Sequence, residues 1–245
     1  MIVPDDCKIS LNNLALDRIG SNQPEKSLKF LGVLMDENLT WAPHVRMVKN
    51  KLSRSIFALN KVKNIFPHDI MKTLYYSLIH SHIMYGFLAW GNAKALNQIA
   101  IMQKRAIRII NRKAYRSHTD PLFRSENILK VNDLYTLQCG LFVFDFMHDN
   151  LPVSFTDFFP TNPDPNSRRA KHIPRNVARP RTTFSANLPY HHFPLIWNNI
   201  DYSTLSIASR HHFKQTVKSS LINMYDAHVV CDNPRCPDCN PTDNV

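Results

Sequence analysis

Three cysteines and one histidine near the C-terminus have the spacing of ligands for a metal ion. They are His228, Cys231, Cys236 and Cys239, in the pattern His-x2-Cys-x4-Cys-x2-Cys. Thiolates and an imidazole at these gaps can reach the four corners of one tetrahedral Zn²⁺ site. The fourth ligand is the least specified, because neither His nor Cys follows Cys239. The sequence predicts a zinc site in this tail, and a set of reduced free thiols is the alternative.

Residues suited to catalysis do not come together in the sequence. Cys139 and His148 are nine residues apart in a helical pattern, which places them on opposite sides of that helix. Cys139 is therefore expected in the core. Asp5-Asp6 is an adjacent pair of carboxylates without a third, and such a pair is expected to be solvated rather than bound to Mg²⁺. No active site is predicted, so we expect that this chain on its own is not an enzyme.

A stripe of positive charge in the middle of the chain indicates contact with phosphate groups. Lys104, Arg108 and Arg112 follow one another at intervals of four residues, and Arg105 lies beside them. Like charges so spaced disfavour an isolated helix by about 0.2–0.5 kcal/mol per pair, unless an anion lies along them. The alternative is a solvated basic face. These four cations are predicted to contact the backbone of a nucleic acid.

Two further groups of cations favour the same partner. One group belongs to the first predicted helix and consists of Lys49, Lys51, Arg54, Lys61 and Lys63. The other lies in a Pro-rich stretch, is uninterrupted by any acid, and consists of Arg168, Arg169, Lys171, Arg175, Arg179 and Arg181. The whole chain has 30 Lys and Arg against 19 Asp and Glu, a formal charge of +11 that attracts polyanions. RNA or DNA is the predicted partner.

The composition excludes several other classes of protein. With 245 residues, 44% of them hydrophobic, the chain can bury a sizeable core. Its five glycines are not grouped into a phosphate-binding loop. No leader pattern or uninterrupted apolar span predicts secretion or a membrane partner. Five cysteines, an odd number, favour a reducing compartment, so an intracellular location, nuclear or cytoplasmic, is expected.

Hydropathy patterns predict a mainly α protein with a small N-terminal β segment, an α+β class. Residues 1–40 are expected to form a hairpin about Asn12-Asn13 and a buried strand over Phe30–Met35. Apolar residues at intervals of three and four predict helices over residues 43–66, 68–90, 93–114, 122–129 and 132–149. Because their connections are short, these helices are expected to pack antiparallel in a domain of residues 41–159.

The C-terminal part of the chain is expected to be organised differently. Residues 160–206 are rich in Pro and Arg and are predicted to form an extended basic arm. Residues 207–245 are predicted to hold a last helix, over about 207–225, and then the Cys-bearing tail.

Several short strings resemble the reverse transcriptases of non-LTR retrotransposons, of the LINE type and jockey-like. The first is Phe30-Leu31-Gly32-Val33, followed by Asp36-Glu37-Asn38-Leu39-Thr40-Trp41 and His44. The similarity continues through Tyr75–His82, Tyr85-Gly86, Ala89–Asn92 and Leu96. It then includes Gln103–Ile110, Tyr115–Phe123, Leu129 and Pro194–Asn198, so that it covers roughly residues 28–200.

The resemblance implies a place in a polymerase for these segments. It places Phe30, Leu31 and Gly32 in the primer grip, at the end of the palm. It implies that the helices after them form the thumb, a bundle that holds the template-primer duplex. For Lys104, Arg105, Arg108 and Arg112 the family supplies no role, so their assignment depends on charge alone.

The chain departs from the family at the catalytic carboxylates. A reverse transcriptase holds two Mg²⁺ ions with an aromatic-x-Asp-Asp turn and an upstream Asp, and Asp5-Asp6 does not complete such a turn. Magnesium is therefore expected only for the missing palm, which with the fingers becomes an expected partner. The first hypothesis is a truncated reverse transcriptase fragment that binds template-primer without catalysis. The second is a stand-alone nucleic-acid-binding or zinc-tail interaction module derived from such an element.

Overall fold

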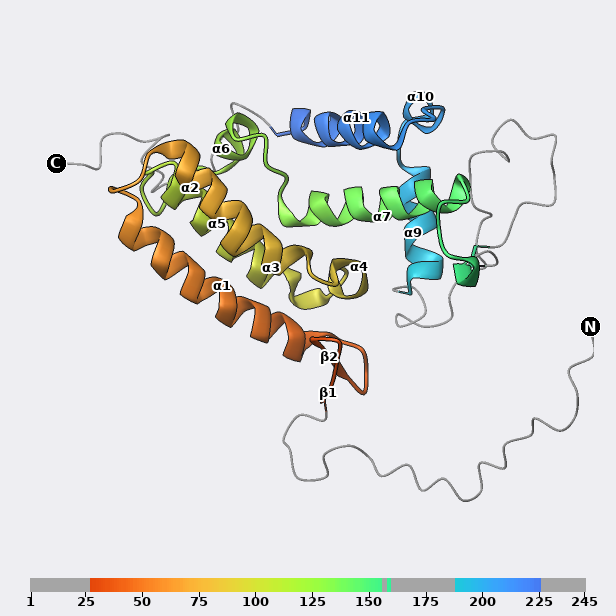
Figure 1. Cartoon of the computed structure of the whole chain (residues 1–245), viewed down its shortest axis with the longest axis horizontal. Helices are drawn as coiled ribbons and strands as arrows, with labels where there is room; N and C mark the ends of the chain where they lie inside the picture. Colours follow the sequence, from red (N-terminus) through yellow and green to blue (C-terminus); the bar gives the residue numbers. More distant parts are fainter. Residues whose placement is uncertain (1–26, 156–157, 160–187, 226–245) are drawn as a thin grey trace, which may run out of the picture.

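The computed structural model describes residues 27–155, 158–159 and 188–225 (Figure 1). Over these residues the chain forms a two-stranded antiparallel sheet followed by helices. This confirms the predicted class, mainly α with a small N-terminal β segment. The hairpin predicted about Asn12-Asn13 lies outside the described residues.

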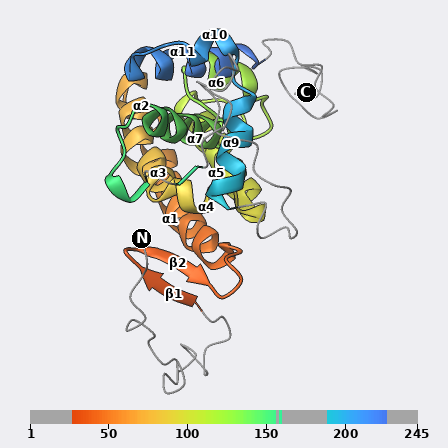
Figure 2. The ribbon, with the colours of Figure 1, turned by 90° about the vertical axis from the view of Figure 1, so that its right-hand side faces the viewer.

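The sheet is a β-hairpin that precedes the first helix. Strands β1 (Ser27–Phe30) and β2 (Val33–Asp36) pair so that Phe30 faces Val33. The two residues between them, Leu31 and Gly32, have φ angles of 44° and 82°, as the tightest hairpin turns require. The predicted buried strand over Phe30–Met35 is therefore wrong, because the chain reverses in the middle of this apolar run. Figures 1 and 2 show the hairpin projecting from the helices.

The first helix, α1 (Ala42–Val62), lies close to the range predicted from its periodicity. Pro43 occupies its first turn, where a missing backbone N–H costs nothing. One side of the helix is buried, and consists of His44, Val45, Val48, Leu52, Ile56 and Leu59. The helix ends four residues before Phe66, and Pro67 then begins the next helical segment.

The helix predicted over residues 68–90 is present but interrupted. It consists of α2 (His68–Tyr75), a π-helical segment η3 (Tyr76–His80), α3 (Ser81–Met84) and α4 (Phe87–Trp90). The break between α3 and α4 comes at Tyr85, which is extended, and at Gly86, which has a φ of 62°. The indole of Trp90 donates a hydrogen bond to the Tyr85 carbonyl at 2.9 Å and so fixes the bend.

The next helices close the core. They are η4 (Lys94–Leu96), α5 (Asn97–Ile110), α6 (Asp120–Ser125), α7 (Val131–Met147) and η5 (Val153–Phe155). Helix α5 is shorter at both ends than the predicted range of 93–114. Helix α7 buries apolar side chains on more than one side, as its density of Leu and Phe predicts, because α4, α5, α9 and α11 contact it.

The last helices correct the prediction of an extended arm. Residues 189–205 contain α9 (Pro189–Asn198) and α10 (Tyr202–Leu205), and α11 (Arg210–Asn223) follows. Helix α9 forms because it buries Phe193, Pro194 and Trp197, and the ring of Phe193 packs edge-on against rings of α7. Pro189 fits its first turn. The prediction is therefore wrong over this stretch, and residues 160–187 lie outside the described residues.

The buried residues of α1 to α11 form one cluster, so a single core holds the described helices together. Figure 1 shows α11 lying along α7, and the two helices are in contact. Just after α11, the Tyr225 hydroxyl donates a hydrogen bond to Asp133 and accepts one from the backbone N–H of Lys130. This contact ties the end of α11 to the start of α7.

Candidate nucleic-acid interface

Positive charge is concentrated in the first helices of the chain. Residues 42–118 contain a single acid, Asp69. The same stretch contains fourteen cations, namely Arg46, Lys49, Lys51, Arg54, Lys61, Lys63, Lys72, Lys94, Lys104, Arg105, Arg108, Arg112, Lys113 and Arg116. Lys72 pairs with Glu126, from outside this stretch, at 3.3 Å, but the single acid of the stretch itself cannot neutralise the other cations. A surface with this excess of positive charge attracts a polyanion.

Helices α1 and α5 pack side by side and run in the same direction. The Lys49 ammonium donates to the Gln98 side chain at 3.1 Å, and the Ser53 hydroxyl lies 3.8 Å from the Met102 sulfur. Both contacts join residues that are 49 apart in the chain, and so does a third contact described below. The direction is shared because the intervening segment α2–α4 brings the chain back before α5 begins.

The side chains beside this seam form a surface that we call the α1/α5 face. At helical spacing from Lys49 and Ser53, it includes Arg46, Phe57 and Lys61 on α1. At helical spacing from Gln98 and Met102, it includes Ile101 and Arg105 on α5, with Lys104 next to them. Within the described residues, Lys104 and Arg105 are exposed and make no hydrogen bond or ion pair. Both are available for phosphate contact.

Apolar side chains interrupt the cations of the α1/α5 face. Phe57 is 64% exposed and Ile101 is 59% exposed, although both are large hydrophobic residues. The Lys61 ammonium lies over the Phe57 ring, 5.3 Å from its centroid. Rings and alkyl groups between cations are typical of surfaces that contact sugars and bases as well as phosphates.

The predicted stripe of four cations is only partly present. Lys104, Arg105 and Arg108 lie on α5, but the helix ends at Ile110 and Arg112 lies beyond it with a φ of 52°. The placement of Arg112 on the same helix is therefore wrong. Arg108 is partly buried and donates to the Ser117 carbonyl at 2.7 Å.

Arg112 instead joins the ends of α5 and α1. Its guanidinium donates to the carbonyls of Lys63 and Phe66, both at 3.0 Å. These carbonyls follow the end of α1, where carbonyl groups lack partners within the helix. The charge of Arg112 stays at the surface, since carbonyls do not neutralise it. Arg108 and Arg112 thus each have a structural contact that would complicate any test of phosphate binding.

The predicted arm and metal ligands cannot be placed on this surface. Arg168, Arg169 and Lys171, and the tail with His228, Cys231, Cys236 and Cys239, lie outside the described residues. Within the described residues, no group of three or more His, Cys, Asp or Glu side chains is placed to hold a metal ion. Cys139 is buried, as predicted, and burial raises the pKa of its thiol to about 12.

The three residues assigned to the primer grip form the tip of the hairpin. Phe30 is 59% exposed and Leu31 is 77% exposed, so the turn presents two apolar side chains to solvent. The Tyr85 hydroxyl donates to the Leu31 carbonyl, and a Cβ on Gly32 would lie 3.3 Å from the Tyr85 ring. Gly32 is required for its φ of 82° as well as for this close approach. Tyr85, at the bend between α3 and α4, therefore fixes the position of the hairpin turn.

A buried histidine of α1 holds the second strand of the hairpin, close to the turn. The backbone N–H of Leu34 donates to Nδ1 of His44 at 3.2 Å, and the His44 ring packs edge-on against Trp90. Burial, with a contribution from the charge of Lys51, lowers the pKa of His44. The ring is held neutral, which lets Nδ1 accept the hydrogen bond. The hairpin is thus held by Tyr85 at its turn and by His44 at β2.

A second group of cations lies on α11, where Lys214 and Lys218 are one helical turn apart. The sequence-based prediction gave these two residues no role, although their spacing could have indicated one. Burial, together with the charges of Lys218 and Lys214, lowers the pKa of His80 in η3. Burial and the charges of Lys214 and Lys72 lower the pKa of Lys218. Lys72 of α2 and Lys214 and Lys218 of α11 therefore come close to one another and to His80, which only the tertiary fold decides.

Comparison of the chain with protein-family models, with curated proteins and with solved structures finds no match. Function must therefore be inferred from the charge and geometry of the chain itself. In the part of the chain that the structure describes, no helix combines the length and the apolar character needed to cross a lipid bilayer.

Proposed function

We propose that this chain binds a template-primer nucleic acid through the α1/α5 face. In this proposal it acts as the thumb-like part of a LINE-type reverse transcriptase, without polymerase chemistry of its own. The observation that carries the proposal is the excess of fourteen cations over one acid in residues 42–118. Many of the residues that resemble the family, such as Tyr75–His82 and Gln103–Ile110, lie in the same stretch, and this resemblance is a separate reason for the same proposal.

The size and chemistry of the α1/α5 face suit a nucleic-acid backbone. Arg46 and Lys61 are fifteen residues apart on α1, or about 22 Å at 1.5 Å per residue. One turn of duplex DNA is about 34 Å long, so the row spans more than half a turn. Phosphates would contact the free ammonium and guanidinium groups of Lys104 and Arg105. The exposed ring of Phe57 would lie against sugars.

The tip of the hairpin suits contact with the end of a primer. Phe30 and Leu31 are exposed, yet the Tyr85 hydroxyl and the Gly32 turn hold the backbone beneath them in one position. In the described part of the chain, β1 pairs only with β2. A two-stranded sheet with an open edge is marginal alone, and the palm of the parent polymerase is the partner that we propose for this edge.

The decisive experiment is a salt titration of duplex binding by a double variant, Lys104→Gln with Arg105→Gln. Each phosphate contact contributes about 0.9 to the slope of log affinity against log salt for duplex DNA. If both residues are contacts, the slope falls by about 1.8. The loss should be nearly the same for duplexes of different sequence, since phosphates carry no base information.

A matched control removes the same net charge elsewhere. Lys214→Gln with Lys218→Gln removes two cations from α11, and its slope should stay that of the parent protein. Equal losses in both double variants would mean that only total charge matters, and the α1/α5 face would not be the interface. Binding with no salt dependence at all would contradict the proposed function.

A further inference from the structure

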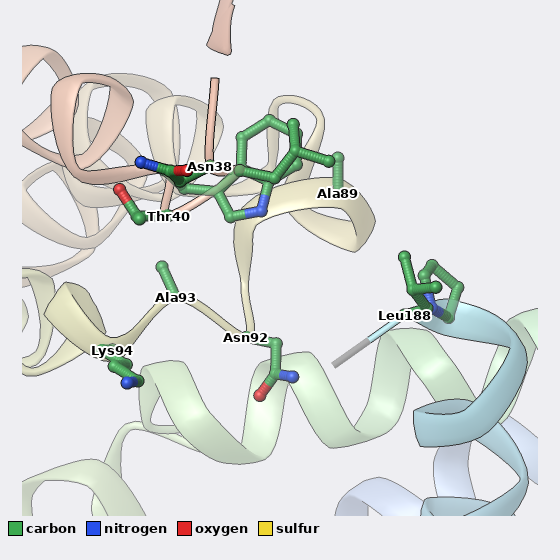
Figure 3. Close-up of a pocket in the computed structure, with 10 residues that line it drawn as sticks. Asn38, Thr40, Ala89, Asn92, Ala93, Lys94 and Leu188 are labelled. Carbon is green, nitrogen blue, oxygen red and sulfur yellow. The ribbon is translucent and has the colours of Figure 1, made fainter. Parts of the chain in front are cut away.

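A hollow of about 340 Å³ lies at the start of α1, between three segments that are distant in sequence. They are residues 38–41 before α1, residues 89–94 around the end of α4, and residues 188–189 at the start of α9. Figure 3 shows Asn38 and Thr40 on one side of the hollow, Asn92 and Lys94 across from them, and Leu188 on a third side. The volume is that of a small-molecule site.

The loop that brings Trp41 to this hollow has a strained backbone. Leu39 and Trp41 have φ angles of 48° and 61°, which are unfavourable for residues with side chains of this size. The carboxylate of Asp36 holds the loop by accepting hydrogen bonds from the Thr40 N–H, the Thr40 hydroxyl and the Trp41 N–H. Burial alone would raise the pKa of Asp36, but these hydrogen bonds outweigh it and lower the pKa. Three hydrogen bonds thus maintain an otherwise unfavourable position of the indole.

The groups around the hollow can bind a planar polar ligand. The Trp41 side chain is half-buried, whereas Trp90 and Trp197 are 0% and 1% exposed, so the Trp41 ring remains accessible. Within the described residues, the Asn38 carboxamide and the Lys94 ammonium have no hydrogen-bond partner. None of the described residues that line the hollow is acidic. An aromatic face, a donor–acceptor pair and a cation are therefore available together.

We propose that this hollow takes one unpaired nucleobase of the bound nucleic acid. The base would stack on Trp41, its edge would meet the Asn38 carboxamide, and its phosphate would meet Lys94. A backbone lying along α1 reaches this place directly, since Arg46 follows Trp41 by little more than one helical turn. The inference rests on the proposed function, because it needs a strand held on the α1/α5 face.

Tryptophan fluorescence of the full chain gives a direct test. The chain has three tryptophans, and only Trp41 is accessible to a stacking base. The probes are a blunt duplex and the same duplex with a single-stranded extension. The extension should tighten binding by about 5- to 150-fold, the range expected for one stacked base, and should quench the fluorescence. The blunt duplex should bind without quenching.

Variants separate stacking from any loss of folding. Trp41→Ala should abolish the gain from the extension and leave the affinity for the blunt duplex unchanged, and Trp41→Phe should restore most of the gain. Asn38→Ala and Lys94→Gln change exposed side chains, so they should reduce the gain without affecting folding.

The two proposals fail in different ways. If the blunt duplex binds but the extension adds neither affinity nor quenching, the base site is wrong and the proposed function stands. A double variant, Asn38→Ala with Lys94→Gln, in which the extension still tightens binding as much as in the parent protein would also overturn the base site. If a free nucleoside monophosphate quenches Trp41 while neither duplex binds, the hollow does take a base, but the proposed function is wrong, and the base does not come from a strand on the α1/α5 face.

Discussion

Three polar side chains fix the backbone around the start and middle of the helical body. His44 accepts a hydrogen bond from the hairpin, Asp36 holds the loop before α1, and Gln103 joins three segments inside the core. The contacts of Gln103 are buried, and the His44–Leu34 and Asp36–Trp41 contacts are partly buried. A buried polar group that loses its partner costs about 1–3 kcal/mol, so these residues affect the local structure more than their number suggests.

The anchoring of the hairpin by His44 should depend on pH. The pKa of His44 is lowered in the folded protein, so the unfolded chain takes up the proton first as the pH falls. The contribution of His44 to stability is therefore complete above the usual histidine pKa of about 6.5, and it declines as the pH falls below that value.

The measurement is the free energy of unfolding by urea between about pH 8 and about pH 5, for the parent protein and His44→Gln. Other histidines titrate in both proteins, so the difference between the two curves isolates His44. The parent protein should lose more stability than the variant on acidification. Parallel curves would mean that His44 is not held neutral by its contacts.

The arrangement of the helices depends on what surrounds each one. Helix α7 buries apolar side chains on more than one side because several helices contact it, whereas α1 buries one side and exposes a row of cations. Gln103 marks the point where α5, α2 and the segment before α7 meet. Its amide donates to the Tyr75 hydroxyl and to the Leu129 carbonyl, and accepts from the Val131 N–H at 2.8 Å.

Replacing Gln103 by Leu should destabilise the protein strongly. The change keeps the size of the side chain but leaves the Leu129 carbonyl and the Val131 N–H buried without partners. We expect a loss of about 2–5 kcal/mol in the free energy of unfolding, measured with urea. Gln98→Leu is the matched control on the same helix, since Gln98 makes a hydrogen bond near the surface, and it should change stability by less than about 0.5 kcal/mol. Equal effects would contradict the role assigned to Gln103.

At the scale of the whole molecule, charge is divided between two parts of the chain. Residues 42–118 hold fourteen cations and one acid. The described residues after 118 hold five cations, namely Arg124, Lys130, Arg210, Lys214 and Lys218. They also hold six acids, namely Asp120, Glu126, Asp133, Asp145, Asp149 and Asp201. Among the described residues the excess of positive charge therefore lies in residues 42–118, and such an uneven distribution orients an approaching polyanion, which favours the α1/α5 face as the first contact.

We predict that the chain on its own does not extend a primer. Two-metal nucleotidyl transfer needs several carboxylates that share two ions, and the sequence lacks the aromatic-x-Asp-Asp turn that supplies them in the family that it resembles. Primer extension on an RNA template with Mg²⁺ and nucleotides should give background only. Template-dependent extension that disappears in Asp5→Ala would contradict this prediction and would give Asp5 a catalytic role.

The zinc site in the tail also remains a prediction. Purified without chelators, the full chain should contain about one zinc per molecule, bound by Cys231, Cys236 and Cys239 with His228 as the fourth ligand. Cys236→Ser should lower the zinc content sharply, because a hydroxyl is a much poorer ligand than a thiolate. A parent protein without zinc, or a variant with unchanged zinc, would favour the free thiols.

Local features of the sequence were enough to predict most helices of the core. The periodicity of α1 and the density of Leu and Phe in α7 are properties of neighbouring residues. Proline interrupts a helix whatever its tertiary surroundings, so Pro67 was enough to predict a break between two helices. The excess of positive charge is likewise independent of the fold. These features were predicted correctly because the information lies within a few turns of chain.

Other features were decided only by contacts between distant segments. The apolar run at Phe30 turns back at Leu31-Gly32 because Tyr85 supports that turn, and α9 forms in a Pro-rich stretch because α7 covers it. Arg112 leaves the predicted stripe because the carbonyls after α1 lie within its reach. The hollow beside Trp41 needs three segments at once. Each outcome depends on which side chain arrives from elsewhere in the chain, and the hydropathy pattern of a single segment does not contain that information.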